Sequence, residues 1–378
     1  MSQPIYLDCN ATTPMEPEVR NAVIRYMEEE FGNEGSRTHE YGARAKQAVQ
    51  KARDQIAKVA GVKREEVVFT SGATEANNLA ILGLAAHGEA KGCKHIISTQ
   101  IEHKAVLEPL EELARRGFEV ELLPPNSDGW IEADRIDATL RPDTLLVSVM
   151  HANNETGVIQ PIEGIADVLK NHPAFFHVDA AQTFGKLIEP LQINRIDLIS
   201  ASAHKIHGPK GVGVLVTRRR GFDRLPLVPL VFGGGQERGL RPGTLPVPLI
   251  VGFGLAAEIA AKDHAKRDAV NTATRVAILE AFSSLNPKLH GDQTRVLPHV
   301  INMSIAGVNS EASMVALKDF IAISNGSACT SANYSLSHVL KAMDLPEEDI
   351  LGALRLSWCH LTPAVDWSQM AARLSTLC

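Results

Sequence analysis

The sequence lacks the features that mark several broad classes of protein. Positive charge is not in excess, because 38 Lys and Arg stand against 44 Asp and Glu and the formal net charge is −6. Such a chain is a poor candidate for general binding to nucleic-acid phosphates. No apolar run approaches the ~18 residues that span a bilayer, and the first residues show no basic stretch followed by an apolar core. We therefore expect a cytoplasmic protein that binds neither membrane nor nucleic acid directly.

Closely spaced cysteines are also missing. The five cysteines are scattered through the chain and form no C-x-x-C pair: Cys9, Cys93, Cys329, Cys359 and Cys378. Their spacing gives no support to a zinc site or a thioredoxin-type motif, so we expect no metal. Dispersed free thiols fit a reducing compartment.

What the chain does contain is a regular alternation of two patterns. Its 378 residues, 44% of them hydrophobic, are enough for a large core and two or three domains. Strands are expected at 66–70, 95–99, 118–123, 144–150, 175–180, 197–203 and 211–217, with helices at 73–86, 103–116 and 162–171. Continuous apolar strands separated by helices indicate parallel strands that are covered on both faces. The fold class is therefore α/β with a doubly wound, mainly parallel sheet.

The pattern changes after about residue 246. A long helix is expected to residue 282, then a strand at 299–305, an apolar segment that ends in a Gly/Ser-rich turn, and two further helices. This predicts a smaller α+β unit, with which the first dozen residues would pack. We predict a large domain at 15–258 and a small domain made of 1–14 and 259–378.

Two charged residues follow predicted strands. Lys205 comes directly after a strand, and the carboxyl end of a doubly wound sheet is where ligands bind. A partly desolvated lysine there suits a Schiff base, although a surface lysine is the plainer interpretation. Asp179 ends an apolar strand and could pair with a protonated pyridine nitrogen, or simply cap the next helix. The pair is more informative than either residue alone.

Three further sites carry weaker signals. The TSGATEAN stretch at 70–77 could form a phosphate cup at a helix start, or Thr74 could be a plain N-cap. His103 follows a strand and could stack on a cofactor ring and exchange protons, or only begin a helix. Cys329 lies among small polar residues, where a thiolate could act as a nucleophile from a flexible loop or have no role.

Taken in order, the motifs resemble one family over almost the whole chain. They are YLDCNATTP, TSGATEANN, EHKAV, HVDAAQ, SAHKIHGPKG, GGGQERGLRPGT, GSACTS and ALRLS. The sequence is similar to the pyridoxal-phosphate-dependent cysteine desulfurases of the class V aminotransferase family. That resemblance implies a fold-type I enzyme that converts L-cysteine to L-alanine and passes sulfur to an acceptor protein. The acceptor could be an iron–sulfur scaffold, a tRNA-thiolating enzyme or a DNA-phosphorothioation enzyme.

The resemblance also implies roles for individual residues. Lys205 would hold pyridoxal 5'-phosphate, Asp179 and Gln182 would contact the ring nitrogen and the ring oxygen, and His103 would be the stacking acid/base. Cys329 would carry the persulfide. The remaining expected contacts are Ala73, Thr74, Ser202 and His204 to the phosphate, Thr244 to the phosphate of a partner protomer in a homodimer, Asn154 to cofactor and substrate, and Arg355 to the substrate carboxylate.

Two positions depart from the family pattern. Cys9 stands where relatives commonly carry a non-thiol residue, and we expect it to serve packing. The SWCHLT segment at 357–362 differs from the pattern that usually follows the arginine at the position of Arg355. The resemblance therefore does not specify which residues form the floor of the pocket. Alternatives in the same fold are a selenocysteine lyase and an ordinary aminotransferase or decarboxylase. A non-catalytic platform that activates a partner is the alternative from another class.

Overall fold

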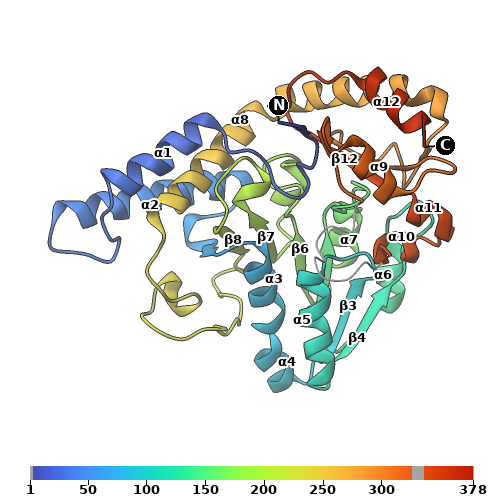
Figure 1. Ribbon diagram of the computed structural model, residues 1–378. Coiled ribbons are helices and arrows are strands. Elements are labelled where there is room, and N and C mark those ends of the chain that lie inside the picture. The colour runs from blue at the N-terminus through green and yellow to red at the C-terminus, as the bar shows by residue number, and fades with distance from the viewer. Residues whose placement is uncertain (1–2, 326–335, 378) are drawn as a thin grey trace.

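A seven-stranded sheet forms the centre of the computed structural model, which describes residues 3–325 and 336–377 (Figure 1). Its strand order is β2-β8-β7-β6-β5-β3-β4. The strands are β2 (Val67–Thr70), β3 (His95–Thr99), β4 (Glu119–Leu123), β5 (Thr144–Met150), β6 (Phe175–Asp179), β7 (Leu198–Ser202) and β8 (Gly213–Thr217). The predicted α/β class with a mainly parallel sheet is confirmed.

Strand β8 is the exception to the parallel arrangement. It runs antiparallel to both of its neighbours, β7 and β2, whereas the other neighbouring strands are parallel. The chain between β7 and β8 contains only a short 3-10 turn, η3 (Ala203–Lys205). A parallel neighbour needs a crossover of a dozen or more residues, so this short connection makes the chain turn back. The expectation of parallel pairing was wrong for this strand.

Helices cover both faces of the sheet because successive side chains of each strand point to opposite sides. In β5, for example, Leu146 packs in the layer with α3 and α5, and Val147 packs in the layer with α2 and α7. The first layer contains α3 (Ala73–Leu82), α4 (Ala85–Lys91) and α5 (Lys104–Arg115). The second contains α1 (Pro17–Glu28), α2 (Glu40–Ala60), α6 (Ala133–Thr139), α7 (Ile162–Val168) and the first half of α8 (Val247–Phe282).

A second, smaller unit has its own apolar core around Trp358. Its sheet has the order β12-β10-β9, and a separate two-stranded sheet pairs β1 with β11. The strands are β1 (Ile5–Tyr6), β9 (Lys288–Leu289), β10 (Val300–Ser304), β11 (Ile321–Ala322) and β12 (Leu354–Ser357). The helices are α9 (Ser310–Leu317), α10 (His338–Ala342), α11 (Glu347–Leu351) and α12 (Trp367–Ser375), so three helices follow residue 336 where the sequence had suggested two.

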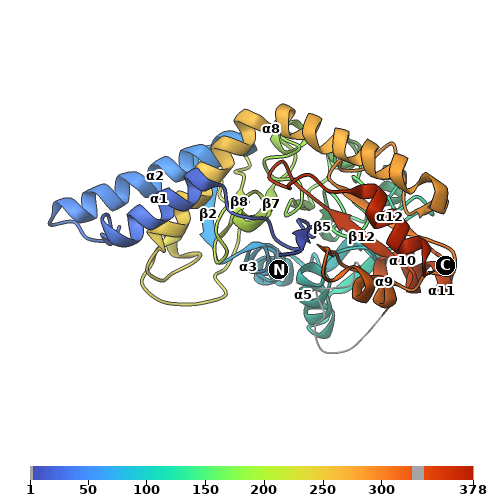
Figure 2. The ribbon, with the colours of Figure 1, turned by 45° about the horizontal axis from the view of Figure 1, so that its top comes forward.

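Helix α8 connects the two cores, and Figure 2 shows the whole length of this helix. Ile250 and Phe253 near its start belong to the core of the large sheet, and Ile278 and Phe282 near its end belong to the core of the small unit. The predicted domain boundary at residue 258 falls inside this continuous helix and stays a prediction. Within residues 3–325 and 336–377, none of the helices has the length and apolar character that crossing a membrane requires.

Candidate active site

A cavity of about 530 Å³ opens at the carboxyl ends of β5, β6 and β7. We call it the lysine pocket, because Lys205 lines it. It brings together most of the residues that the sequence predicted from distant positions. Its lining includes Ala73, Thr74, His103, Asn154, Asp179, Gln182, Ser202, His204, Lys205 and Arg355.

Lys205 lies at the end of η3, immediately after β7. Its amine donates to the backbone oxygens of Asn10 and Ala11, the second at 3.0 Å. These carbonyls belong to the segment after β1, so the N-terminal chain crosses the large sheet to hold the lysine. The amine is thus a hydrogen-bonded group inside a cavity, and the interpretation of Lys205 as a plain surface lysine does not fit.

Asp179 ends β6 and is only 6% exposed. One carboxylate oxygen accepts from the backbone N–H of Ala181 at 2.9 Å, and the other accepts from the side-chain amide of Asn77 at 2.7 Å. The first contact lies within a turn and caps no helix, because the next helical element is η2 (Glu189–Gln192). The second is a buried side-chain contact from α3, and it orients the carboxylate within the pocket. A buried carboxylate of fixed orientation is suited to hold a proton on a heterocyclic nitrogen.

His103 is the N-cap of α5 and also lines the lysine pocket. Its Nδ1 accepts from the backbone N–H of Ala105 at 3.0 Å, which makes it the N-cap. Burial lowers the pKa of the imidazole, with the Asp179 charge opposing this shift. The ring is therefore neutral at neutral pH, and because Nδ1 accepts a hydrogen bond the proton resides on Nε2. The same residue lines the lysine pocket with a proton to donate.

The start of α3 provides an anion cup. Its N-cap is Gly72, which has no side chain to satisfy the first backbone N–H groups, so Thr74 lies inside the helix and is not the N-cap. Free N–H groups and the helix dipole favour a phosphate at such an end. Ser202 at the end of β7 and His204 in η3 line the same pocket. Burial lowers the pKa of His204 to about 4, so a neutral ring is available as a hydrogen-bond donor.

Arg355 lies in β12 of the small unit and is 1% exposed. Its guanidinium donates to the backbone oxygen of Asn154 at 3.0 Å and to a carboxylate oxygen of Asp8 at 2.6 Å. The Nε atom has no partner among the described residues. A buried guanidinium with a free donor, facing a polar cavity, is suited to a carboxylate ligand.

The sequence analysis missed the residues that support these side chains. Asn10, Asn77 and Asp8 received no role, although their motifs were noted. Buried oxygens of Asn10, Asn77 and Gln182 in the pocket wall have no hydrogen-bond partner among the described residues. Buried polar atoms are rarely left unpaired, so these oxygens indicate a polar ligand in the pocket. The donors, acceptors and anion cup together fit pyridoxal phosphate.

Two predicted residues do not lie in this wall. Thr244 is exposed and does not line the pocket of its own chain. Cys329 lies outside the described residues. The chain on either side of residues 326–335 is held near the pocket, because Ser324 forms a β-bridge with Arg355 and the Ser337 hydroxyl donates to Glu155 at 2.5 Å.

Comparison with known proteins agrees with this geometry. The family model described as aminotransferase class-V matches residues 5–366. The cysteine desulfurase IscS of Vibrio vulnificus (strain YJ016) is 46% identical over 365 residues, which cover 96% of this chain and 89% of that protein. The crystal structure of DndA from Streptomyces lividans is 50% identical, with a TM-score of 0.83 and coverage of 92% and 98% of the two chains. A NifS-like protein is 35% identical with a TM-score of 0.89, covering 99% and 98%.

The chain therefore belongs to the class-V aminotransferase family. Within that family it is a pyridoxal-phosphate-dependent cysteine desulfurase, the activity of the relatives that match nearly all of its length.

Proposed function

We propose that this chain converts L-cysteine to L-alanine at the lysine pocket and carries the released sulfur as a persulfide on Cys329. One observation carries the proposal: Lys205, Asp179, His103 and Arg355 line a single cavity, although they come from both units of the fold. The segment that contains Cys329 is attached at both of its ends to residues near that cavity.

Each protein group has a part that follows from its surroundings. Pyridoxal phosphate, when bound, supplies the electron sink. Asp179 holds the proton on the ring nitrogen, and Arg355 binds the substrate carboxylate through charge-assisted hydrogen bonds. The Lys205 amine takes the proton from the α-carbon of the substrate, and His103 donates from Nε2.

The sulfur-transfer step needs no reactant other than the chain and its substrate. The Cys329 thiolate forms an S–S bond to the substrate sulfur, and the C–S bond of the substrate breaks. The carbon side keeps the electron pair and takes up a proton, so the products are alanine and a Cys329 persulfide. The persulfide then delivers its outer sulfur to an acceptor protein. An iron–sulfur scaffold, a tRNA-thiolating enzyme and a DNA-phosphorothioation enzyme are the acceptor classes that we consider.

The deciding experiment is Cys329→Ser on the cofactor-loaded enzyme, with Cys93→Ser as the matched control. We expect the Cys329 variant to lose alanine release from L-cysteine, while its cofactor absorbance and the spectral change on adding cysteine remain. A hydroxyl is a far weaker nucleophile toward sulfur than a thiolate. Cys93 is a partly exposed thiol outside the lysine pocket, so its variant should keep full activity.

Normal alanine release by Cys329→Ser would contradict the proposal. Retained turnover of L-selenocysteine with loss of turnover of L-cysteine would point to the selenocysteine lyase alternative, in which selenium leaves without a protein thiol. No turnover of either substrate by the wild-type enzyme would favour the non-catalytic platform.

We further propose a cytoplasmic homodimer in which Thr244 of one protomer reaches the phosphate of the other. The exposed position of Thr244 supports this, since a residue that serves a partner's pocket must face away from its own. Light scattering at micromolar concentration should give twice the mass of the chain, and Thr244→Ala should weaken cofactor retention. A fully active monomer would contradict the arrangement.

A further inference from the structure

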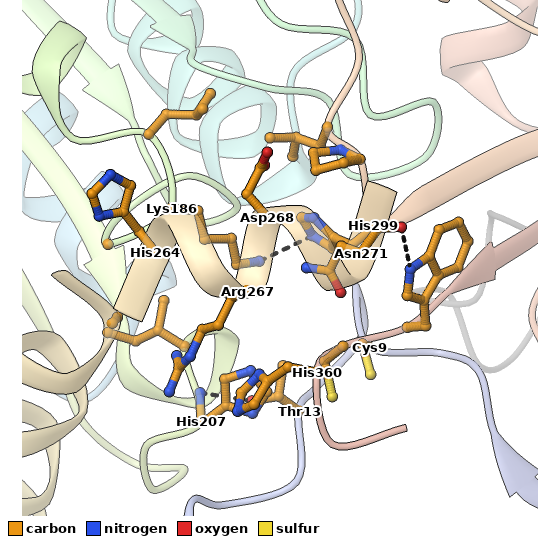
Figure 3. A pocket seen from close by; sticks show the side chains of 18 residues that line it. Cys9, Thr13, Lys186, His207, His264, Arg267, Asp268, Asn271, His299 and His360 are labelled. Carbon is orange, nitrogen blue, oxygen red and sulfur yellow. Dashed lines mark hydrogen bonds between the residues drawn. The ribbon is translucent and has the colours of Figure 1, made fainter. Parts of the chain in front are cut away.

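A second cavity lies beside the lysine pocket, and none of the described residues lines both. We call it the thiol cavity, because Cys9 and Cys359 line it. Its volume is about 50 Å³, far smaller than that of the lysine pocket. Neither the reaction proposed above nor the family resemblance gives this cavity a role. Figure 3 shows the side chains that surround it.

Three sulfur and nitrogen groups converge on one side of the thiol cavity, and a fourth, the Cys9 thiol, lines the same cavity. Among the described residues, His207, Cys359 and His360 each offer one ligand atom, and these three atoms lie within 4.8 Å of one another. The Cys9 and Cys359 thiols interact, since Cys359 raises the pKa of Cys9 and Cys9 lowers the pKa of Cys359. In Figure 3 the rings of His207 and His360 lie together and Cys9 lies beside them. The groups come from three separate segments: the chain after β1, the turn after β7 and the chain after β12.

The outer nitrogens of both imidazoles are held by oxygen atoms. Nδ1 of His207 donates to the backbone oxygen of Pro14 at 3.0 Å, which leaves the Nε2 lone pair free. Nε2 of His360 donates to the carboxylate of Glu16 at 3.1 Å, which leaves the Nδ1 lone pair free. Histidines that bind metals almost always donate their other ring N–H to a carboxylate or a carbonyl in this way.

We propose that the thiol cavity is a structural Zn²⁺ site formed by Cys9, Cys359, His207 and His360. Two thiolates and two imidazoles are a preferred ligand set for tetrahedral zinc. The two thiolate charges cancel the charge of the ion, so the site is neutral, as burial requires. Ligand atoms on such an ion lie about 3.6 Å apart, given Zn–S and Zn–N distances of ~2.3 and ~2.1 Å. The three ligand atoms of His207, Cys359 and His360, which lie within 4.8 Å of one another, would have to approach by about 1 Å, and the Cys9 sulfur, which lies outside this set, would have to join them.

The cations around the cavity are already engaged with other groups. The Arg267 guanidinium donates to Glu16 at 3.0 Å, so the carboxylate that orients His360 also balances this charge. The Lys186 amine lies 3.1 Å from Nε2 of His299 (Figure 3), and its charge also acts on the Cys9 and Cys359 thiols. The cluster therefore keeps its own sulfur and nitrogen lone pairs available to a metal ion.

A metal here would join the three segments that also supply the lysine pocket. Cys9 adjoins Asn10, whose carbonyl oxygen accepts a hydrogen bond from the Lys205 amine. His207 lies two positions after Lys205, and Cys359 follows β12, the strand that contains Arg355. Zinc would fix the relative positions of these segments from outside the pocket. This inference does not rest on the proposed reaction, since its ligands and its test are independent of turnover.

The test is the metal content of the cofactor-loaded enzyme, measured by elemental mass spectrometry after dialysis against a zinc-containing buffer and then a metal-free buffer. We expect about one zinc per chain in the wild type and a nearly complete loss in Cys359→Ser. Cys93→Ser should keep the zinc, and so should Cys329→Ser, which excludes binding at the proposed persulfide thiol. Co²⁺ loaded in place of zinc should give the intense visible bands of a tetrahedral thiolate site, and these should be absent from Cys359→Ser.

Glu16→Gln provides a test that leaves every ligand in place. Removal of such a supporting carboxylate typically lowers metal affinity 10–100-fold, so this variant should lose zinc to a chelator sooner than the wild type. If Cys359→Ser does not fold, the chelator experiment on Glu16→Gln decides the question alone. Zinc well below one per chain in the wild type, equal zinc in wild type and Cys359→Ser, or a Cys9–Cys359 disulfide in place of metal would each overturn the proposal.

Discussion

The lysine pocket and the thiol cavity are adjacent sites that share three stretches of chain, yet they differ in almost every physical respect. The lysine pocket is about ten times larger, with volumes of about 530 and 50 Å³, and its wall contains buried oxygens that have no partner within residues 3–325 and 336–377. The thiol cavity is small, and its imidazoles already have oriented outer partners. Open polar space suits a ligand that comes and goes, whereas a tight, pre-oriented cluster suits a single resident ion.

Residues that are neighbours in the chain line different cavities. Cys9 lines the thiol cavity and Asn10 lines the lysine pocket; in the same way Lys205 lines the pocket and His207 the cavity. His207 adopts φ of 67°, a left-handed conformation that residues other than glycine seldom take. Its backbone N–H donates to the Thr13 hydroxyl at 2.8 Å, so the turn that ends the lysine segment is stabilised by the segment after β1.

The largest effect that separates the two sites is expected from Lys205→Ala. Loss of a positioned proton-transfer group typically costs 10²–10⁴-fold, so alanine formation should fall by at least about that factor. Zinc content should stay at the wild-type value, because Lys205 does not line the thiol cavity. Rates are measured as alanine release, and metal is measured on the same sample. Loss of zinc together with activity would show that the two sites are not independent.

A smaller effect is expected from Arg355→Gln. The variant removes charge-assisted hydrogen bonds worth about 1.5–3 kcal/mol, so kcat/KM for L-cysteine should fall about 10–150-fold, mostly through KM. The change also leaves the Asp8 carboxylate without its ion-pair partner. The double variant Asp8→Asn/Arg355→Gln removes that unpaired charge, so a loss of substrate binding can be told from a loss of stability. Arg115→Gln, at an exposed position on α5, is the matched control and should behave like the wild type. An unchanged KM would remove Arg355 from the proposed carboxylate site.

A third effect, on stability and not on activity, concerns Glu102, which lies next to His103 in the scaffold of the lysine pocket. The side chain of Glu102 is fully buried. One carboxyl oxygen accepts hydrogen bonds from the Thr99 hydroxyl and from the backbone N–H of Met150. The other carboxyl oxygen has no partner among the described residues. Burial raises the pKa of this carboxyl to about 8. The folded protein therefore keeps a proton that the unfolded chain loses near pH 4.3, so this group makes stability fall as the pH rises from about 4.3 to 8.

Glu102→Gln should remove this dependence, because the amide does not titrate. The unfolding free energy should then decline less steeply over that pH range, by up to about 1.4 kcal/mol per pH unit. Melting temperatures of the cofactor-loaded enzyme at several pH values measure it, with Glu111→Gln on the exposed side of α5 as the control. If the melting temperatures of wild type and variant change equally with pH, Glu102 is ionised in the folded state.

Much of the fold and the lysine pocket could be predicted because their signals are local. Strand β5 has the bounds that its apolar run indicated, and Asp179 and Lys205 follow strands whose carboxyl ends must meet at one edge of a parallel sheet. The reversal at β8 was missed because pairing direction depends on the length of the connection, and the apolar pattern of the strand is the same in either direction. The roles of Asn10 and Asn77 were missed because their partners lie far away in the sequence.

By itself, the sequence determined the α/β class, the seven strands of the large sheet, and the lysine, aspartate and histidine that meet in the pocket, because each of these follows from patterns a few residues long. Only the tertiary structure decided which distant segments touch. Cys9, His207 and Cys359 have no spacing typical of a metal site, and Asp8 is 347 positions from Arg355. Their convergence results from backbone hydrogen bonds that join the segment after β1 to Ser357 in β12 and to His204 in η3, and such long-range contacts leave no periodic trace in the residues that make them.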